Sequence, residues 1–129
     1  MPLPLHVLVI DESSKDRKSV KQLLGRSSSY VVHEASDHQH GLRRTRAVHP
    51  DCILLEVLIN GAVEIDVLHH LKRHKNERRV PVIVWTALKF LPLVQAAVQQ
   101  SGASGWLSKH LTSSQELEKA IRTTVESVS

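Results

Sequence analysis

Residues 50–58, which read PDCILLEVL, decide the fold. They contain an unbroken apolar run, residues 52–55, and that run ends on the carboxylate of Glu56. A strand that is apolar on both faces is typical of the middle of a parallel sheet covered by helices on both sides. Open sheets of this kind bind their ligands just beyond the carboxyl ends of the strands. The sequence therefore predicts that Glu56 lies at the functional edge of the sheet.

Hydrophobic periodicity predicts further strands and helices on either side of this central strand. The predicted strands cover residues 7–10, 30–32, 80–85 and 105–107, and the predicted helices cover 13–25, 37–49, 65–75, 92–102 and 113–128. Capping-box patterns mark the start of the first helix, at Ser13 and Asp16, and of the last, at Ser113 and Glu116, and Ser36 or Asp37 caps the second. Residues 58–63 are predicted to be a loop. The alternation indicates an α/β protein with a doubly wound parallel sheet of five strands, in the flavodoxin-like order 2-1-3-4-5, and with helices on both faces.

Composition indicates one soluble domain over residues 1–129. The net charge of +4 is too mild to imply nucleic acid by itself. The single cysteine, Cys52, lies inside the apolar run, so we expect a buried thiol, no disulfide and a reducing, cytoplasmic setting. No signal peptide is evident, and no segment has the roughly 20 apolar residues that span a bilayer.

Four of the predicted strands end on polar side chains. Because the carboxyl ends of parallel strands meet at one edge, these side chains should converge on the crevice between the first and third strands. Clustered carboxylates suit a divalent cation such as Mg²⁺, and a lysine with a hydroxyl suits the oxygens of a phosphoryl group. The sequence thus predicts a site for phosphoryl chemistry. Its residues are Asp11, Glu12, Glu56, Thr86 and Lys109.

These strand ends lie in motifs that resemble the receiver domain of two-component response regulators, across essentially the whole chain. The motifs are VLVIDE (7–12), PDCILLEV (50–57), PVIVWTA (81–87) and GASGWLSK (102–109). The resemblance implies that Asp11 and Glu12 bind Mg²⁺ together with the carboxylate at position 56. It also implies that Thr86 and Lys109 contact the oxygens of a phosphoryl group, which a histidine kinase supplies in that family.

The phosphoacceptor position departs from the family, because Glu56 stands where the resemblance places an aspartate. In-line phosphoryl transfer depends on positioning, and a misplacement of about 1 Å can cost about 100-fold in rate. The additional carbon of glutamate adds roughly 1.5 Å of bond length. We therefore expect a pseudo-receiver that keeps the fold and is not an enzyme, although residual self-phosphorylation and dephosphorylation stay open. We also expect weak Mg²⁺ binding and a salt bridge from Lys109 to Glu56.

Further departures lie near this position. Asn60 and Glu64 stand where the family has proline and glycine, so we expect a remodelled loop beside the site. His110 follows Lys109 where the family has a cis proline. A cis bond before another residue costs about 2.5–4 kcal/mol, so we expect a trans bond here. Trp106 replaces the tyrosine or phenylalanine whose rotation reports phosphorylation in the family, and we expect its bulk to restrict it to one orientation.

The segment after the fourth predicted strand carries four large apolar side chains, at Leu88, Phe90, Leu91 and Leu93. Such a group indicates either an exposed patch that binds a partner or local packing under the loop. In the family that the chain resembles, partners and second copies bind the face made by the fourth helix, fifth strand and fifth helix. We expect a protein partner or a homodimer through that face.

The leading hypothesis is a phosphorylation-independent interaction module of two-component signalling. One alternative is an active, Mg²⁺-dependent phosphoacceptor domain of a phosphorelay. A weaker alternative is nucleic-acid contact through the basic residues 72–79. It is weaker because basic side chains are also common at the carboxyl ends of helices for structural reasons. Other motifs have simple structural explanations. Asp11 and Glu12 alone would suit helix caps, Trp85 and Trp106 suit a core, and His70 with His74 suits a solvated helix face.

Overall fold

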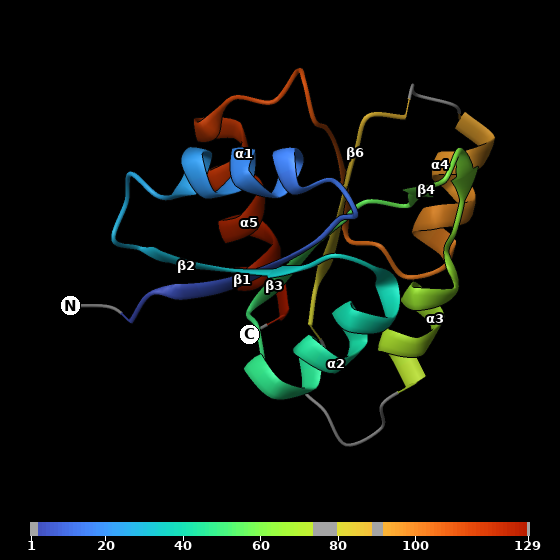
Figure 1. Cartoon of the computed structure of the whole chain (residues 1–129), viewed down its shortest axis with the longest axis horizontal. Helices are drawn as coiled ribbons and strands as arrows, with labels where there is room; N and C mark the ends of the chain where they lie inside the picture. Colours follow the sequence, from blue (N-terminus) through green and yellow to red (C-terminus); the bar gives the residue numbers. More distant parts are fainter. Residues whose placement is uncertain (1–2, 74–79, 89–91, 129) are drawn as a thin grey trace.

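The computed structural model describes residues 3–73, 80–88 and 92–128, without the side chains of residues 72, 73 and 128. Its centre is a parallel sheet of five strands in the order β2-β1-β3-β6-β7 (Figure 1). The strands of this sheet are β1 (Leu5–Ile10), β2 (Tyr30–Ala35), β3 (Cys52–Leu55), β6 (Val82–Thr86) and β7 (Gly105–Ser108). The predicted fold class and strand order are confirmed.

Helices cover both faces of the sheet. They are α1 (Ser14–Leu24), α2 (His38–Val48), α3 (Asp66–Arg73), α4 (Pro92–Gln100) and α5 (Ser114–Val128). One hydrophobic cluster joins the sheet to α1 and α5, and a second joins it to α2, α3 and α4. Figure 1 shows α1 and α2 on opposite sides of the strands.

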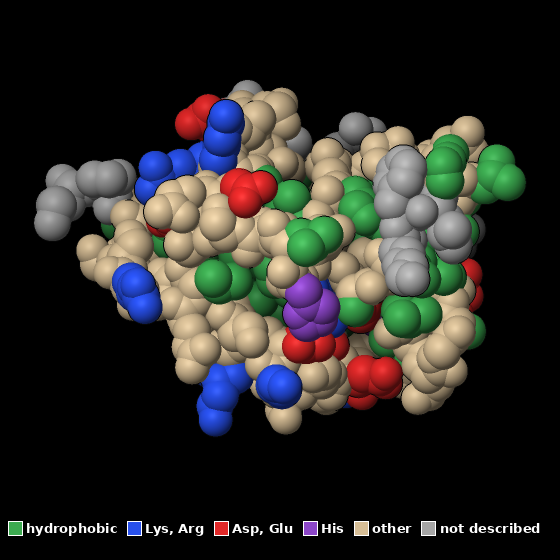
Figure 2. All heavy atoms as spheres, turned by 90° about the horizontal axis from the view of Figure 1, so that it is seen from above, with side chains coloured by type: hydrophobic (Ala, Val, Ile, Leu, Met, Phe, Trp, Pro, Cys, Tyr) green, Lys and Arg blue, Asp and Glu red, His purple; other side chains and the backbone are tan. Residues whose placement is uncertain are grey.

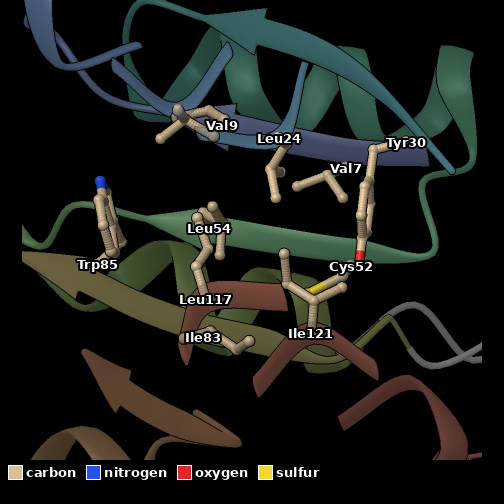
Figure 3. Close-up of a cluster of buried hydrophobic side chains, with 11 residues drawn as sticks. Val7, Val9, Leu24, Tyr30, Cys52, Leu54, Ile83, Trp85, Leu117 and Ile121 are labelled. Carbon is tan, nitrogen blue, oxygen red and sulfur yellow. The ribbon is translucent and has the colours of Figure 1, made fainter. Parts of the chain in front are cut away.

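Alternation along the strands explains these two clusters. On β1, Val7 and Val9 point into the α1 and α5 cluster, whereas Leu8 and Ile10 point into the other. All four are fully buried, because β1 lies inside the sheet between β2 and β3. Figure 3 shows Val7 and Val9 on the same side as Leu54 of β3, which lies next to Leu117 of α5. The predicted central strand, β3, alternates in the same way and is buried at all four positions in the middle of the sheet, so that prediction is confirmed.

Side-chain caps fix where the helices begin. The Ser13 hydroxyl accepts a hydrogen bond from the amide N–H of Asp16 at 3.2 Å. Ser113 and Glu116 each accept from the amide N–H of the other at 3.1 Å, which is a complete capping box at the start of α5. The box at α5 confirms the sequence prediction, whereas at α1 only the Ser13 half of the predicted box forms, because the N–H of Ser13 donates to Asp11 Oδ1 at 3.0 Å. Asp37 caps α2, and its carboxylate accepts from His40 N–H at 2.7 Å.

The prediction of a loop over residues 58–63 is wrong. The chain forms a hairpin there, with β4 (Leu58–Ile59) antiparallel to β5 (Ala62–Val63). The two residues between the strands have positive φ, +50° at Asn60 and +79° at Gly61. An Asn-Gly pair adopts this backbone readily, and the resulting turn matches the twist of short antiparallel strands. The same pair that suggested a loop is therefore a strong hairpin signal.

None of the described helices is both long enough and apolar enough to cross a bilayer.

Candidate functional site at the strand ends

Parallel pairing brings the strand-end residues to one edge of the sheet. Ile10 of β1 is in register with Leu55 of β3, and Thr86 of β6 with Ser108 of β7. The ladders extend one residue further, since Glu56 N–H donates to the carbonyl of Ile10 at 3.0 Å and Lys109 N–H donates to that of Thr86 at 3.0 Å. The residues that follow β1, β3 and β7 therefore lie close together, as predicted.

Lys109 is the centre of this site. Its Nζ lies 2.5 Å from Asp11 Oδ2, 3.0 Å from Glu56 Oε1 and 3.0 Å from Asp16 Oδ2. The side chains of Lys109, Asp11 and Glu56 are at most 5% exposed, and that of Asp16 is 26% exposed. The predicted Lys109–Glu56 salt bridge is confirmed. One buried ammonium thus neutralises part of the charge of three carboxylates, and we call these four residues the lysine cluster.

The Glu56 carboxylate has further partners in the backbone. Its Oε2 accepts from the N–H of Leu58 at 3.1 Å, and its Oε1 accepts from that of Ala87 at a long 3.4 Å. Two loops, the ones after β3 and β6, therefore hold the carboxylate in place together with the ammonium of Lys109. Behind it, the Nε2 of His38 lies 2.9 Å from the carbonyl oxygen of Glu56.

Asp16 is a site residue that sequence reasoning missed. The sequence indicated it only as part of the capping box that starts α1. Its backbone does serve that cap, while its carboxylate points to Lys109, which is 93 residues away in the chain. An available signal was its place in the first turn of the helix after Asp11, which sets it beside the same strand ends. No local pattern gives the distant partner.

The charges of the lysine cluster act on each other. Burial is the largest influence on Asp11 and raises the pKa of its carboxyl, although Lys109 and the Ser13 N–H oppose the rise. Burial also acts to lower the pKa of Lys109, but Asp11 and Glu56 outweigh it and the pKa is raised. For Asp16, desolvation is outweighed by Lys109, so the pKa is lowered. Lys109 is therefore held firmly in its charged form.

The structure does not bring Glu12 and Thr86 into the lysine cluster. The Glu12 side chain is exposed, and its Oε1 accepts from Asn60 N–H at a long 3.4 Å. Thr86 is fully buried, and its Oγ1 accepts from Leu88 N–H at 3.0 Å. The hydrogen bond from Leu88 orients the Thr86 hydroxyl toward the loop after β6.

Binding of Mg²⁺ at this edge would require carboxylate oxygens that converge on one point. Within the described parts of the chain, no group of three or more His, Cys, Asp or Glu side chains is arranged to hold a metal ion. The ammonium of Lys109 lies where it contacts both Asp11 and Glu56, so these carboxylates are arranged around an internal cation. In this arrangement the residues do not fit a magnesium ion, whose octahedral shell needs several oxygens that converge on one point.

Of the remaining predicted residues, the structure describes Trp106 and Leu88. Trp106 is half-buried on β7 and packs against the cluster of α2, α3 and α4, while Leu88 is half-buried. Phe90, Leu91 and most of the basic run, residues 74–79, lie outside the described residues. The bond between Lys109 and His110 is trans, as predicted, since the described residues contain no cis bond.

Comparison with known proteins now identifies the family. The model of the response regulator receiver domain matches residues 7–122, which is most of the chain. The chain therefore belongs to the response regulator receiver domain family, and it is a receiver domain of two-component signalling. The resemblance inferred from the strand-end motifs is confirmed.

Individual relatives support this assignment. The chain is 29% identical to the two-component response regulator ARR7 of Arabidopsis thaliana, over 81% of this chain and 55% of that protein. It is 31% identical to the phosphate regulon transcriptional regulatory protein PhoB of Escherichia coli, over 63% of this chain and 35% of that protein. The chain thus spans about a third to about half of the length of these relatives.

A solved structure agrees across the whole domain. The signal receiver domain of the response regulator NarL from Mycobacterium tuberculosis is similar with a TM-score of 0.85 and 27% identity. The match covers 97% of this chain and 98% of that one. The likeness therefore includes all five strands and the helices between them.

Proposed function

We propose that this receiver domain is a pseudo-receiver, which signals by binding a protein partner without phosphoryl transfer. The observation that carries the proposal is the state of the Glu56 carboxylate. It is buried, paired with Lys109 and bonded to two backbone N–H groups, so the groups that would receive a phosphoryl oxygen already hold a carboxylate oxygen.

The steric argument points the same way. Acyl phosphate formation would require the Glu56 oxygen to attack a phosphorus atom in line, with open space beyond that oxygen. Here the oxygens face the Lys109 ammonium and the N–H groups of Leu58 and Ala87. Attack would first break these contacts and would leave buried charges unpaired, which costs several kcal/mol. The domain is therefore proposed not to act as an enzyme.

Magnesium binding is proposed to be weak for a related reason. Asp11 and Glu56 share the ammonium of Lys109, and Glu12 lies outside the lysine cluster, on the exposed side. An external dication must compete with this internal cation. Any binding would depend on Asp11 and Glu12 and would require Lys109 to move.

Treatment with a phosphodonor tests the chemistry. The wild type, incubated with acetyl phosphate or with beryllofluoride and Mg²⁺, is expected to show no adduct by intact mass or by fluorine NMR. The matched variant Glu56→Asp shortens the carboxylate and is expected to form at least a partial adduct, because the shorter side chain opens space beside Lys109. A stoichiometric adduct at Glu56 in the wild type would favour the alternative, an active phosphoacceptor domain of a phosphorelay supplied by a histidine kinase.

The partner is proposed to bind the face made by α4, β7 and α5. Leu93 on α4 is 88% exposed, and Leu111, just before α5, is 82% exposed. Figure 2 shows hydrophobic side chains gathered at the end of the molecule where α4 lies. Large exposed apolar side chains of this kind mark interaction surfaces when they lie together. Trp106 is half-buried on β7, the edge strand that follows α4 and precedes α5 in the chain.

Self-association without a phosphodonor tests this surface. We expect sedimentation of the wild type to show a dimer, and the variant Leu93→Asp to be a monomer. Leu3→Asp is the matched control, because Leu3 is also 88% exposed but lies two residues before β1. Equal behaviour of the two variants would contradict the assignment of this face.

A further inference from the structure

A groove lies between α2, α3 and the β4–β5 hairpin, beside the lysine cluster. Its volume is about 580 Å³, within the range of ligand-binding pockets. Residues of α2, of β4, of α3 and of the loop after β1 line it, so its walls come from segments far apart in the sequence. Figure 1 shows α2 and α3 side by side on one face of the sheet, on the other side from α1.

The groove combines an apolar floor with an acidic rim. Leu42 and Ile59 are half-buried in its wall, and Val67 is only 2% exposed. Around them stand four carboxylates, those of Glu12, Asp37, Glu64 and Asp66, all on exposed residues. Such a surface matches a partner that is apolar and cationic at once.

The charge of the rim is not neutralised within the described part of the molecule. None of its four carboxylates forms an ion pair with Arg17, Lys21 or Lys109, whose described ion pairs go to Glu34 and to the lysine cluster. Asp37 and Asp66 lie at the start of α2 and α3, and each offsets roughly half a unit of helix-dipole charge. Glu12 and Glu64 have no such compensation. The groove is therefore net negative.

The rest of the chain has the opposite sign. The whole sequence has 17 basic and 13 acidic side chains, so removing the four of the groove leaves nine acidic ones elsewhere. A cationic partner is therefore attracted to this groove and repelled by the rest of the surface. This contrast makes the location selective, because complementary potentials guide encounter and exclude wrong contacts.

We propose that the groove binds a short cationic, amphipathic segment of another protein, with an apolar residue on the floor and lysine or arginine side chains on the rim. Lysine and arginine stems pack on apolar surface while their charged ends stay in water, which fits this arrangement. A second copy of this chain fits less well. The exposed large hydrophobic side chains of the described residues all lie outside α1, α2 and α5, the helices that carry most of the exposed basic side chains.

The groove is separate from the face of α4, β7 and α5, so this proposal stands whether or not the function proposed above is correct. It nevertheless reaches the strand-end site. His38 lines the groove, and its Nε2 lies 2.9 Å from the carbonyl oxygen of Glu56. A segment bound there would change the surroundings of Glu56 without touching its carboxylate.

The test uses the full chain and defined peptides. The probe is a fluorescein-labelled peptide of leucine and lysine in an amphipathic helical pattern, followed by anisotropy at low ionic strength. The comparators are the same peptide with glutamate in place of lysine, and an oligolysine of equal length. We expect the leucine–lysine peptide to bind and the glutamate peptide not to bind. Amide shifts in NMR spectra are expected to map to α2, α3 and the hairpin.

Two matched charge reversals locate the binding. Glu64→Lys is expected to weaken the leucine–lysine peptide about ten-fold, whereas Glu118→Lys, on α5 at the other face of the sheet, changes it less than about two-fold. Equal weakening by both variants, equal affinity for oligolysine, or shifts mapped elsewhere would overturn the proposal. Self-association that Glu64→Lys abolishes would overturn it too, since the occupant would then be a second copy.

Discussion

The lysine cluster and the groove contain similar carboxylates in opposite situations. In the cluster, three carboxylates surround one ammonium that is 4% exposed. In the groove, four carboxylates on exposed residues have no described cation. The sequence predicts the Lys109–Glu56 pair, but it does not predict that the carboxylates of the groove lack a described cation, because acidic residues occur at the start of helices and the end of strands in both places. In the lysine cluster, the ammonium of Lys109 neutralises part of the carboxylate charge. In the groove, the charge is available to attract a cationic partner.

This contrast bears on how the domain signals. A receiver site that depends on an external cation and an external phosphoryl group has two inputs that change with conditions. In the proposed pseudo-receiver, Lys109 takes the place of the first and Glu56 blocks the second. Under that proposal, the remaining variable input is the binding of a partner at the surface. Changes to the lysine cluster should therefore alter stability, whereas changes to the groove should alter binding.

The largest expected effect is that of Lys109→Met. It removes the ammonium while Asp11 and Glu56 stay buried, and an unpaired buried charge costs about 3–5 kcal/mol of unfolding free energy. Urea denaturation measures this loss. The control Lys119→Met, exposed on α5, is expected to change stability by less than about 0.5 kcal/mol.

The same variant separates an internal from an external cation. Without the ammonium, the carboxylates of the lysine cluster are free to accept Mg²⁺. Added MgCl₂ should therefore raise the melting temperature of Lys109→Met more than that of the wild type. If MgCl₂ raised the melting temperature of the wild type as much, Lys109 would not be acting as the cation of this site.

Much of the fold follows from local pattern. The apolar run of β3, the Ser13 cap of α1, the capping box of α5 and the alternation of strands and helices each depend on neighbours in sequence. The sheet order was predicted because it is a common order for a doubly wound sheet. The hairpin at Asn60 was misjudged because turn residues alone do not reveal whether short flanking segments pair. Its two-residue strands give too little alternation to detect.

The site was predictable only where it follows the strands. Asp11, Glu56, Thr86 and Lys109 end strands, so their position follows from the sheet, and even the Lys109–Glu56 pair follows from charge. The contact of Asp16 with Lys109 and the separation of Glu12 from the cluster depend on side-chain directions across 93 and 48 residues of sequence. The direction of a side chain is decided by tertiary packing, and the pattern of residues along the sequence does not reveal that packing.

A smaller effect is expected from Asp16→Asn. Asp16 is partly exposed, so losing its charge is expected to cost about 1 kcal/mol at pH 7. Because Lys109 lowers the pKa of Asp16 below its ordinary value of 3.8, the folded state binds protons less readily than the unfolded state. This stabilisation is therefore present above pH 3.8 and is lost as the pH falls through the lowered pKa.

Urea midpoints measured between about pH 2 and pH 7 check this sign. The wild type and Asp16→Asn should differ at neutral pH and converge in acid, while the control Glu118→Gln should differ little from the wild type throughout. A constant difference at every pH would show that Asp16 acts through packing or through its cap, and not through its charge.

The smallest expected effect is that of Glu64→Gln in the groove. Removing one of four like charges relieves repulsion among exposed groups, so stability should rise slightly, by about 0.2–0.5 kcal/mol at low salt. Repulsion of exposed charges is screened at about 1 M NaCl, so the gain should vanish there. The effect of Lys109→Met should persist in the same salt, because its charges are buried. Urea denaturation of both variants at the two salt concentrations makes the comparison. A loss of stability in Glu64→Gln would mean that this carboxylate has a partner that stabilises the fold, and the groove would then resemble the lysine cluster after all.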